Sequence, residues 1–413
     1  MPSLARLRSL REDHPAFVAV AAVLVAFHLV YPAVDWWLRA AEIAPTFDFW
    51  DFGAYRGGVE RWRTGEPLYV ENENGGYHGS YLYPPVALLL FAPFVGHPFG
   101  PEAWVLASAL LLWVGMVGVV ESLVGRRSWG ERLLLGWFLC GFQPLVLASK
   151  MGQTAAFMSG VLCFAFVALE RGAESRSARV ASGALTGLVG VVKFAYAPVG
   201  AHLLANRDRF AGAVVAGLGL AAVSLLAFGL ESHRTYVEVL AWGVGQGGNA
   251  RSPALWLAPY FRPLAGHSMA LAVRLAGSVI VAAYALCAED ADRTVFALGV
   301  AAFPLLTPLA YTYYFVALLP AAAILVHGEL ERGGRPVVPT LGLGFVSIHS
   351  YGLYAITNGL PELLPAVASI PGIYFLLQPG LWGSTLLAGT ALVRVAESVS
   401  IPEWLPDAAR DQA

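Results

Sequence analysis

Two aspartates stand among aromatic residues in the polar stretch after the first apolar run. Asp48 and Asp51 belong to the segment FDFWDF of residues 47–52. An aspartate among aromatic rings at a membrane interface is partly desolvated, which raises its proton affinity and suits it to act as a general base. The alternative is an interfacial aspartate near Arg56, with the rings forming an ordinary aromatic belt. The local sequence leaves both interpretations open.

Cations in apolar surroundings are the second feature that points to chemistry. The sequence contains two lysines, Lys150 and Lys193, and both lie in apolar stretches. An unpaired ammonium is costly there and usually marks a functional site or a specific partner. The simpler alternative is a cation that extends to the membrane interface. Arg251, in a later polar stretch, poses the same choice.

Metal and nucleotide motifs are absent from the sequence. Two residues separate Asp48 from Asp51, which is not a DxD pattern, and the nine histidines show no HxxxH or HxxE spacing. No P-loop or GxGxxG opens a helix after a strand. Cys140, Cys163 and Cys287 lie in apolar runs without CxxC spacing. We therefore expect no metal ion and no nucleotide cofactor.

The elements that must position these residues are membrane helices. Hydrophobic residues make up 57% of the 413-residue chain and charged residues 13%, whereas a soluble domain carries about 25% charged residues. Apolar runs of about 20 residues, long enough to cross a bilayer, recur along nearly the whole chain. The first, at about residues 16–38, is too long for a signal peptide, and we interpret it as a retained transmembrane helix. The sequence predicts an all-α integral membrane protein, a multi-pass helical bundle.

Arginine-rich loops set the predicted orientation, because such loops mark the cytoplasmic side. They lie at residues 126–132, 171–179, 207–209, 290–293 and 329–335. With these loops and the N-terminal residues 1–15 inside, the outside holds a first loop at 39–82 and a second at 231–266. We predict ten to thirteen membrane segments, one membrane domain over residues 1–413, and a cytoplasmic tail at 397–413.

Broken or re-entrant segments are also expected, because parity requires at least one. The candidates are residues 83–97, which begin with Tyr-Pro-Pro, and residues 180–205, which Lys193 and Pro198 interrupt. Broken helices occur in membrane proteins where the backbone is buried in protein or lines a cavity. In the first external loop a short interfacial helix is predicted from about Ala54 to Thr64, ending at Gly65.

Several short motifs, taken in order, resemble glycosyltransferase family 87. The first external loop supplies DFxxY at residues 51–55, GEPLY at 65–69 and YPP at 83–85. Later matches are GQ at 152–153, VKF at 192–194 with Pro198, GNARS at 248–252, and TP at 307–308 before a tyrosine-rich segment that reaches Pro320. The resemblance covers roughly residues 45–320.

This resemblance implies a GT-C fold and transfer of a hexose, mostly mannose, from a polyprenyl-phosphate donor to a glycan or glycolipid acceptor. Asp51 matches the family's first-loop aspartate and would be the general base of an inverting reaction, with Asp48 as the alternative. The residues implied in contacts with the donor phosphate or the substrates are Lys193, Lys150, Arg251, Asn249, Gln153, Tyr55, Tyr313 and Tyr314. The expected location is the plasma membrane, among membrane lipids, with the site facing outside and no nucleic-acid partner.

The chain departs from the family pattern near its late motif. Tyr311, Tyr313 and Tyr314 stand where the family often shows tryptophan and paired histidines. A tyrosine can hydrogen-bond a phosphate or a sugar hydroxyl but is a poor base near neutral pH. A histidine role is therefore not carried over to these positions.

Two other classes of protein remain open on the sequence. A transporter or flippase of lipid-linked sugars would share the apolar bulk, the broken helices and the intramembrane lysines. Transporters commonly show two similar halves, and no second copy of the segment 51–85 is present. The third class is a non-catalytic subunit of a surface-glycan assembly complex.

Overall fold

The computed structural model describes residues 4–44, 46–73, 75–77, 79–246, 268–307, 310–370 and 373–399. In these ranges the chain forms α-helices and short 3-10 helices, with no β-strand beyond an isolated bridge between Ala288 and Val399. The all-α architecture predicted from the sequence is confirmed.

The helices follow one another closely along the chain. The elements of the first half are α1 (Leu4–Asp13), α2 (Pro15–Ala40), α3 (Trp50–Thr64), η1 (Pro85–Ala87), α4 (Leu88–Phe91), α5 (Gly100–Val124), α6 (Trp129–Cys140), α7 (Gln143–Met151), α8 (Ala155–Arg171), α9 (Arg176–Val192), η2 (Phe194–Gly200) and α10 (Ala201–Leu204). Those of the second half are α11 (Arg207–Gln246), α12 (Ser268–Cys287), α13 (Asp292–Leu306), η4 (Thr312–Ala317), α14 (Leu318–Glu331), α15 (Val337–Ser347), α16 (His349–Leu363), α17 (Pro365–Ala368), α18 (Ile373–Leu376) and α19 (Pro379–Ala396).

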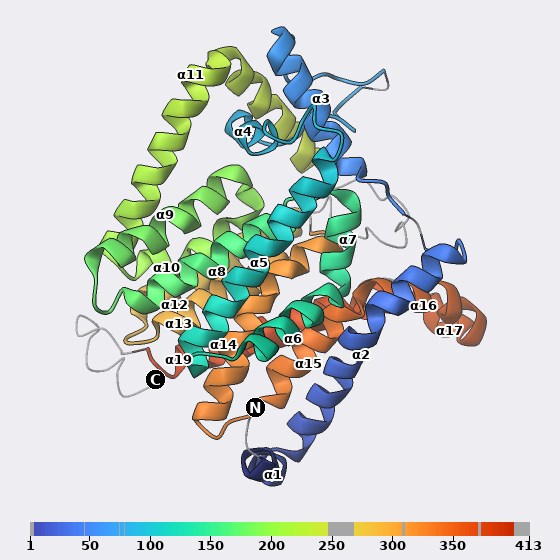
Figure 1. The fold of residues 1–413 in the computed structure, drawn as a ribbon, viewed down its shortest axis with the longest axis vertical. Coiled ribbons are helices and arrows are strands. Elements are labelled where there is room, and N and C mark those ends of the chain that lie inside the picture. Colours follow the sequence, from blue (N-terminus) through green and yellow to red (C-terminus); the bar gives the residue numbers. More distant parts are fainter. Residues whose placement is uncertain are drawn as a thin grey trace.

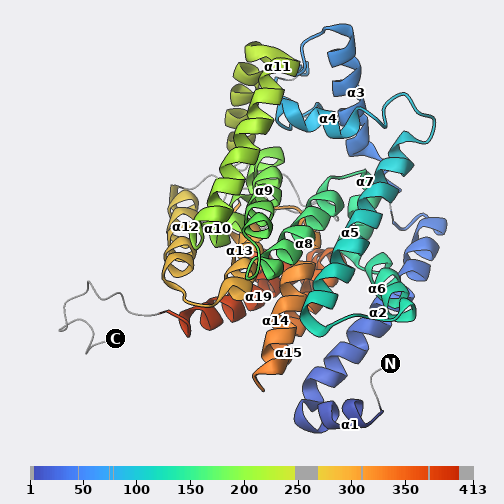
Figure 2. The same cartoon turned by 60° about the vertical axis from the view of Figure 1, so that its left-hand side comes forward.

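A central group of apolar helices carries the rest of the fold. Helix α8 packs against α5 and α9, α13 packs against α19, and α15 against α19. Helix α2 lies on one side of this group and the long α11 on the other, where it packs against α9 (Figure 1). Helices α3 and α4 cover one end, as the turned view also shows (Figure 2). The candidate site lies beneath that cover.

Several helices are long and apolar enough to cross a membrane. In the described ranges these are Pro15–Ala40, Gly100–Val124, Arg207–Gly243 and Thr312–Glu331, with a fifth if the bent pair α6 and α7 counts as one span. The multi-pass membrane architecture is confirmed. The predicted ten to thirteen segments counted apolar runs, many of which fold into shorter helices, so that number stays a prediction.

The breaks expected in two segments are present. Residues 83–97 form only η1 and α4, both too short to span a bilayer. Helix α9 ends at Val192, and the chain continues as η2 from Phe194. A further bend of 69° separates α6 from α7. These interruptions leave the ends of several helices near one another.

The two predicted external loops contain more helix than the sequence indicated. Helix α3 ends at Gly65, which caps it with a φ of 75°, as predicted, but it begins at Trp50 rather than Ala54. Helix α11 continues to Gln246 through a kink at Gly229, which has a φ of 69°. Residues 231–246 of the predicted second loop are therefore helical, and residues 247–267 lie outside the described residues.

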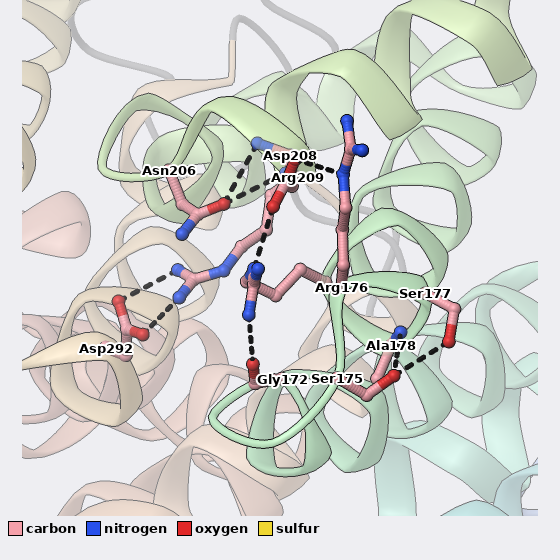
Figure 3. Close-up of polar contacts among 10 residues, drawn as sticks. Gly172, Ser175, Arg176, Ser177, Ala178, Asn206, Asp208, Arg209 and Asp292 are labelled. Carbon is pink, nitrogen blue, oxygen red and sulfur yellow. Dashed lines mark hydrogen bonds and ion pairs between the residues drawn. The ribbon is translucent and has the colours of Figure 1, made fainter.

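The arginine-rich loops share the end of the bundle opposite α3. Figure 3 shows the guanidinium of Arg209 against the carboxylate of Asp292. Nearby, Nε of Arg179 lies 2.9 Å from Oδ2 of Asp208. A cavity of about 960 Å³ opens there, lined by residues of the α8–α9, α10–α11, α12–α13 and α14–α15 connections and by Leu123 of α5. Four of the five arginine-rich loops thus contribute residues to one cavity.

Because α9 packs closely on α11, a methyl group added at a contacting glycine of α9 should destabilise the fold. A Cβ at Gly183 would lie 1.8 Å from the carbonyl oxygen of Arg209, whereas one at Gly190 on the same helix would meet no atom within 4 Å. We expect Gly183→Ala to lower the free energy of unfolding by about 2 kcal/mol through overpacking. Gly190→Ala should be neutral or stabilising by up to about 1 kcal/mol, because alanine favours helix. Unfolding of both variants in detergent checks this, and equal stability would contradict the packing.

Candidate active site

Asp51 lies in the first turn of α3, directly after an unusual stretch of backbone. Phe47, Asp48 and Phe49 have φ values of 64°, 42° and 56°, a left-handed conformation that non-glycine residues seldom adopt and that costs free energy. The backbone N–H of Phe49 donates to the carbonyl of Lys150 at 2.9 Å. The start of α3, and with it Asp51, is therefore tied to the end of α7.

Gln153 holds the Asp51 carboxylate from the break between α7 and α8. Its Nε2 donates a hydrogen bond to Oδ2 of Asp51. The preceding Gly152 caps α7 with a φ of 69°, and a Cβ there would lie 2.8 Å from the Cβ of Phe52. Glycine is needed at this position both for the turn and for the close approach of α3. The Gly-Gln motif thus brings an amide to the aspartate.

Tyrosine hydroxyls surround the other end of the Gln153 amide. The Tyr83 hydroxyl donates to Gln153 Oε1 at 3.1 Å, and the Tyr55 hydroxyl lies 3.3 Å from the same oxygen. The hydroxyls of Tyr83 and Thr154 are 3.1 Å apart. Neither Tyr83 nor Thr154 was among the predicted site residues. The signal for Tyr83 was its place before two prolines, which restricts the backbone to an extended conformation.

Lys193 reaches the same cluster from the end of α9. Its Nζ donates to the Tyr83 hydroxyl at 2.8 Å and lies 4.5 Å from the ring centroid of Tyr314, 4.8 Å from that of Tyr83 and 5.7 Å from that of Tyr313. Such contacts attract a cation to the faces of the rings. Within the described ranges Lys193 makes no ion pair. Its ammonium is placed by hydroxyl and aromatic groups.

The electrostatics of the cluster suit Asp51 to proton transfer. Burial raises the pKa of the Asp51 carboxyl, while the hydrogen bond from Gln153 and the charge of Lys193 act in the opposite direction. Desolvation thus makes the carboxylate more basic, and its two neighbours preserve the ionised form. This is the balance that a general base requires.

Lys150 lies outside this cluster. Its Nζ is 2.6 Å from Oδ1 of Asp35 on α2, and Oδ2 of Asp35 pairs with Arg39 at 3.0 Å. Asp35 lies inside the first apolar run and belongs to no motif that would have indicated it from the sequence. The ammonium of Lys150 therefore forms an ion pair with α2, and its role as a phosphate ligand stays a prediction.

The remaining predicted residues fall in different places. Tyr55, Gln153, Tyr313 and Tyr314 are buried in or beside the cluster, whereas Asp48 is exposed. Asn249 and Arg251 lie outside the described residues. In the part of the chain that the structure describes, no group of three His, Cys, Asp or Glu residues is arranged to hold a metal ion. The cavity of about 960 Å³ lies at the far end of α8, whose 17 residues span about 25 Å, and is separate from the cluster.

Comparison with known proteins identifies the family. Residues 81–308, more than half of the chain, match glycosyltransferase family 87. The chain belongs to this family. The resemblance seen in the sequence is confirmed, and the protein is a membrane glycosyltransferase.

Two curated relatives and one solved structure resemble this family 87 enzyme over most of its length. The relatives are polyprenol-phosphate-mannose-dependent alpha-(1-2)-phosphatidylinositol pentamannoside mannosyltransferases. The one from Mycolicibacterium smegmatis is 27% identical, with 87% of this chain and 85% of the relative covered. The one from Mycobacterium tuberculosis is 25% identical, with 95% and 88% covered. The crystal structure of ArnT from Cupriavidus metallidurans bound to undecaprenyl phosphate gives a TM-score of 0.40 at 16% identity, with 91% of this chain and 77% of that chain covered.

The pairing of Lys150 predicts how α2 is held to the site. We expect Asp35→Asn to lower the free energy of unfolding by about 3 kcal/mol, because it leaves a largely buried ammonium without its partner. Arg39→Gln removes the more exposed partner of the same carboxylate and should cost less than about 1 kcal/mol. Unfolding in detergent measures both, and an equal loss from the two variants would show that the Lys150 pair carries no special weight.

Proposed function

We propose that the protein transfers a mannosyl group from a polyprenyl-phosphate donor to a mannosylated lipid or glycan on the outer face of the plasma membrane, with Asp51 as general base. The observation that carries the proposal is the partly buried Asp51 carboxylate, held by Gln153, with the Lys193 cation in the same cluster. A base and a separate cation are the two groups that this reaction needs.

The reaction is a single displacement. The acceptor hydroxyl gives its proton to the Asp51 carboxylate as its oxygen bonds to the anomeric carbon of the sugar. The bond between that carbon and the phosphate oxygen breaks, and the lipid phosphate leaves as an anion. One displacement inverts the anomeric carbon. Because the lipid phosphate is stable as an anion when it leaves, no general acid is needed to protonate it.

Of the predicted phosphate-binding cations that the structure describes, Lys193 is the one best placed to stabilise the departing phosphate. Its ammonium has a hydroxyl and aromatic faces around it but no carboxylate partner among the described residues. Its charge is therefore available to an incoming anion, and charge-assisted contacts to a leaving phosphate strengthen as negative charge develops. The charge of Lys150, by contrast, is already balanced by Asp35.

The charge at the two ends of the bundle supports the proposed orientation. The charged loops gather at the end opposite α3, and arginine-rich short loops favour the cytoplasmic side. Asp51 then faces outside, where a lipid-linked sugar rather than a nucleotide sugar is the available donor. The mannosyl donor and the mannosylated phosphatidylinositol acceptor are the substrates named for the two curated relatives, and they guide the choice of test substrates.

The first test is removal of the base. Asp51→Asn keeps the size of the side chain but cannot accept the proton, and we expect at least a 100-fold loss of kcat. The measurement is transfer of radiolabelled mannose from polyprenyl-phosphate mannose to mannosylated phosphatidylinositol, with purified protein in detergent. Asp48→Asn is the matched comparison, since Asp48 is exposed and three residues away, and it should stay within about 3-fold of wild type.

The other outcomes of that assay are equally informative. Equal transfer by wild type and a folded Asp51→Asn protein would remove Asp51 as the base. A large loss in Asp48→Asn alone would move the role to Asp48. No transfer by wild type, together with movement of lipid-linked sugar across liposomes, would make the protein a transporter.

The second test is the pH dependence of the reaction. Asp51 accepts a proton only when ionised, so kcat/KM should persist above its pKa and fall as the pH drops through it. Because burial raises that pKa, the midpoint of the acidic limb should lie above about pH 4, the ordinary value for aspartate. Gln153→Glu removes the hydrogen bond that opposes the shift and adds a negative charge, so the midpoint should move up by at least about one pH unit. An unchanged midpoint would show that another group titrates.

A further inference from the structure

We propose that Tyr83 is a positioning residue, whose hydroxyl fixes the Lys193 ammonium and the Gln153 amide relative to the catalytic base. The inference rests on the proposed function for its meaning in catalysis, but its geometric content can be tested without any sugar transfer. Among the described residues Tyr83 makes no hydrogen bond to Asp51; it acts through the two side chains that it joins.

The hydroxyl of Tyr83 lies at the centre of the cluster. It accepts a hydrogen bond from Lys193 Nζ at 2.8 Å and donates one to Gln153 Oε1 at 3.1 Å. The hydroxyls of Thr154, 3.1 Å away, and Tyr55, 3.3 Å away, also contact it. Lys193, Tyr83 and Gln153 come from three segments separated by between 40 and 110 residues in the chain, so this hydroxyl is the point where they meet.

The chemistry of Lys193 and Asp51 fixes the direction of each hydrogen bond in the series that joins them through Tyr83 and Gln153. A lysine ammonium can only donate and an ionised aspartate can only accept. Lys193 therefore donates to the oxygen of Tyr83, the Tyr83 proton points to Gln153 Oε1, and the Gln153 amide nitrogen donates to Asp51. Without the Tyr83 hydroxyl the ammonium loses the one hydrogen bond that it makes to the part of the chain that the structure describes. The amide loses one of the donors that hold its oxygen away from the carboxylate.

The Tyr83 ring is held independently of its hydroxyl. It packs edge-to-face on Tyr55 with ring centroids 5.4 Å apart and lies 6.1 Å from the Tyr81 centroid. The backbone carbonyl of Tyr83 accepts a hydrogen bond from the Tyr69 hydroxyl at 2.7 Å. Tyr83→Phe therefore keeps the ring, including its face toward Lys193, and removes the hydroxyl that links the ammonium to the amide and that also contacts the Tyr55 and Thr154 hydroxyls.

Tyr81→Phe is the matched control for this change. Tyr81 is also buried in the same loop, and its hydroxyl also makes a hydrogen bond, to the carbonyl of Pro84 at 2.8 Å. It contacts neither Lys193 nor Gln153 by hydrogen bonding in the described structure. The two variants should lose similar stability, so an effect on the site that appears only in Tyr83→Phe reports positioning and not general loosening of the loop.

The first readout uses the scarcity of lysine in this chain. Lysine labelled with ¹³C gives two side-chain signals, from Lys150 and Lys193, and Lys150→Arg assigns them. We expect the Lys193 signal to move and sharpen in Tyr83→Phe, because the ammonium leaves its fixed place over the rings, while the Lys150 signal stays. In Tyr81→Phe both signals should keep their wild-type positions.

The second readout is the kinetics of mannosyl transfer. In Tyr83→Phe we expect kcat to fall by about 10- to 50-fold, less than the loss of a direct transition-state donor. KM for the donor should stay within about 3-fold, and the acidic limb of kcat/KM should move to higher pH, because Lys193 no longer lowers the proton affinity of Asp51. Tyr81→Phe should change neither kcat nor the limb.

Each remaining outcome decides the matter. An unmoved Lys193 signal with wild-type kinetics in Tyr83→Phe would overturn the proposal, as would equal effects in Tyr81→Phe. If wild type transfers no mannose, the proposed function fails while the Lys193 signal still tests the positioning. Should Tyr83→Phe not fold, Thr154→Val removes one of the two hydroxyls that contact the phenol, the other being that of Tyr55. A smaller movement of the Lys193 signal in Thr154→Val supports the proposal, and no movement overturns it.

Discussion

The hydrogen bond from the Gln153 amide to Asp51 is the interaction on which the rest of the site depends. A side-chain amide has one donating and one accepting end. Because its nitrogen is committed to the carboxylate, its oxygen must face the hydroxyls of Tyr55 and Tyr83. A reversed amide would set its oxygen against a carboxylate and its N–H groups against the Tyr83 hydroxyl, whose oxygen already accepts a hydrogen bond from Lys193. The polarity of one buried amide thus orders the whole cluster.

The site exists because several helices are interrupted at the same end of the bundle. Gly152 ends α7, the chain leaves α9 at Lys193, and prolines follow Tyr83. Broken helices are tolerated at membrane depth where other protein groups satisfy the freed backbone or a cavity is lined. Here the freed ends are covered by α3, and the backbone N–H of Phe49 reaches the carbonyl of Lys150. The apolar central helices supply the rigidity that holds these breaks together.

The sequence predicted what depends on local pattern. Apolar runs indicated the membrane helices, Gly65 the end of α3, and Lys193 the break after α9. It could not predict side-chain partners brought together by long-range packing. Lys150 resembled a site cation because its partner, Asp35, lies 115 residues away inside an apolar helix. Tyr83 belongs to a recognised motif, but the partners of its hydroxyl, Gln153 before α8 and Lys193 after α9, are brought to it only by the fold. Such pairings are set by tertiary structure, which periodicity does not encode.

The arrangement also explains how a base and a cation can serve one reaction without cancelling each other. A direct ion pair between Asp51 and Lys193 would lower the proton affinity of the base and occupy the charge meant for a phosphate. The structure instead places the Tyr83 hydroxyl and the Gln153 amide between them. Each end keeps a partner that is neutral, so the ammonium can still attract an anion and the carboxylate can still take a proton. Tyr83 and Gln153 thus hold the ammonium and the carboxylate in fixed positions. The ammonium can then act on the departing phosphate while the carboxylate acts on the acceptor hydroxyl.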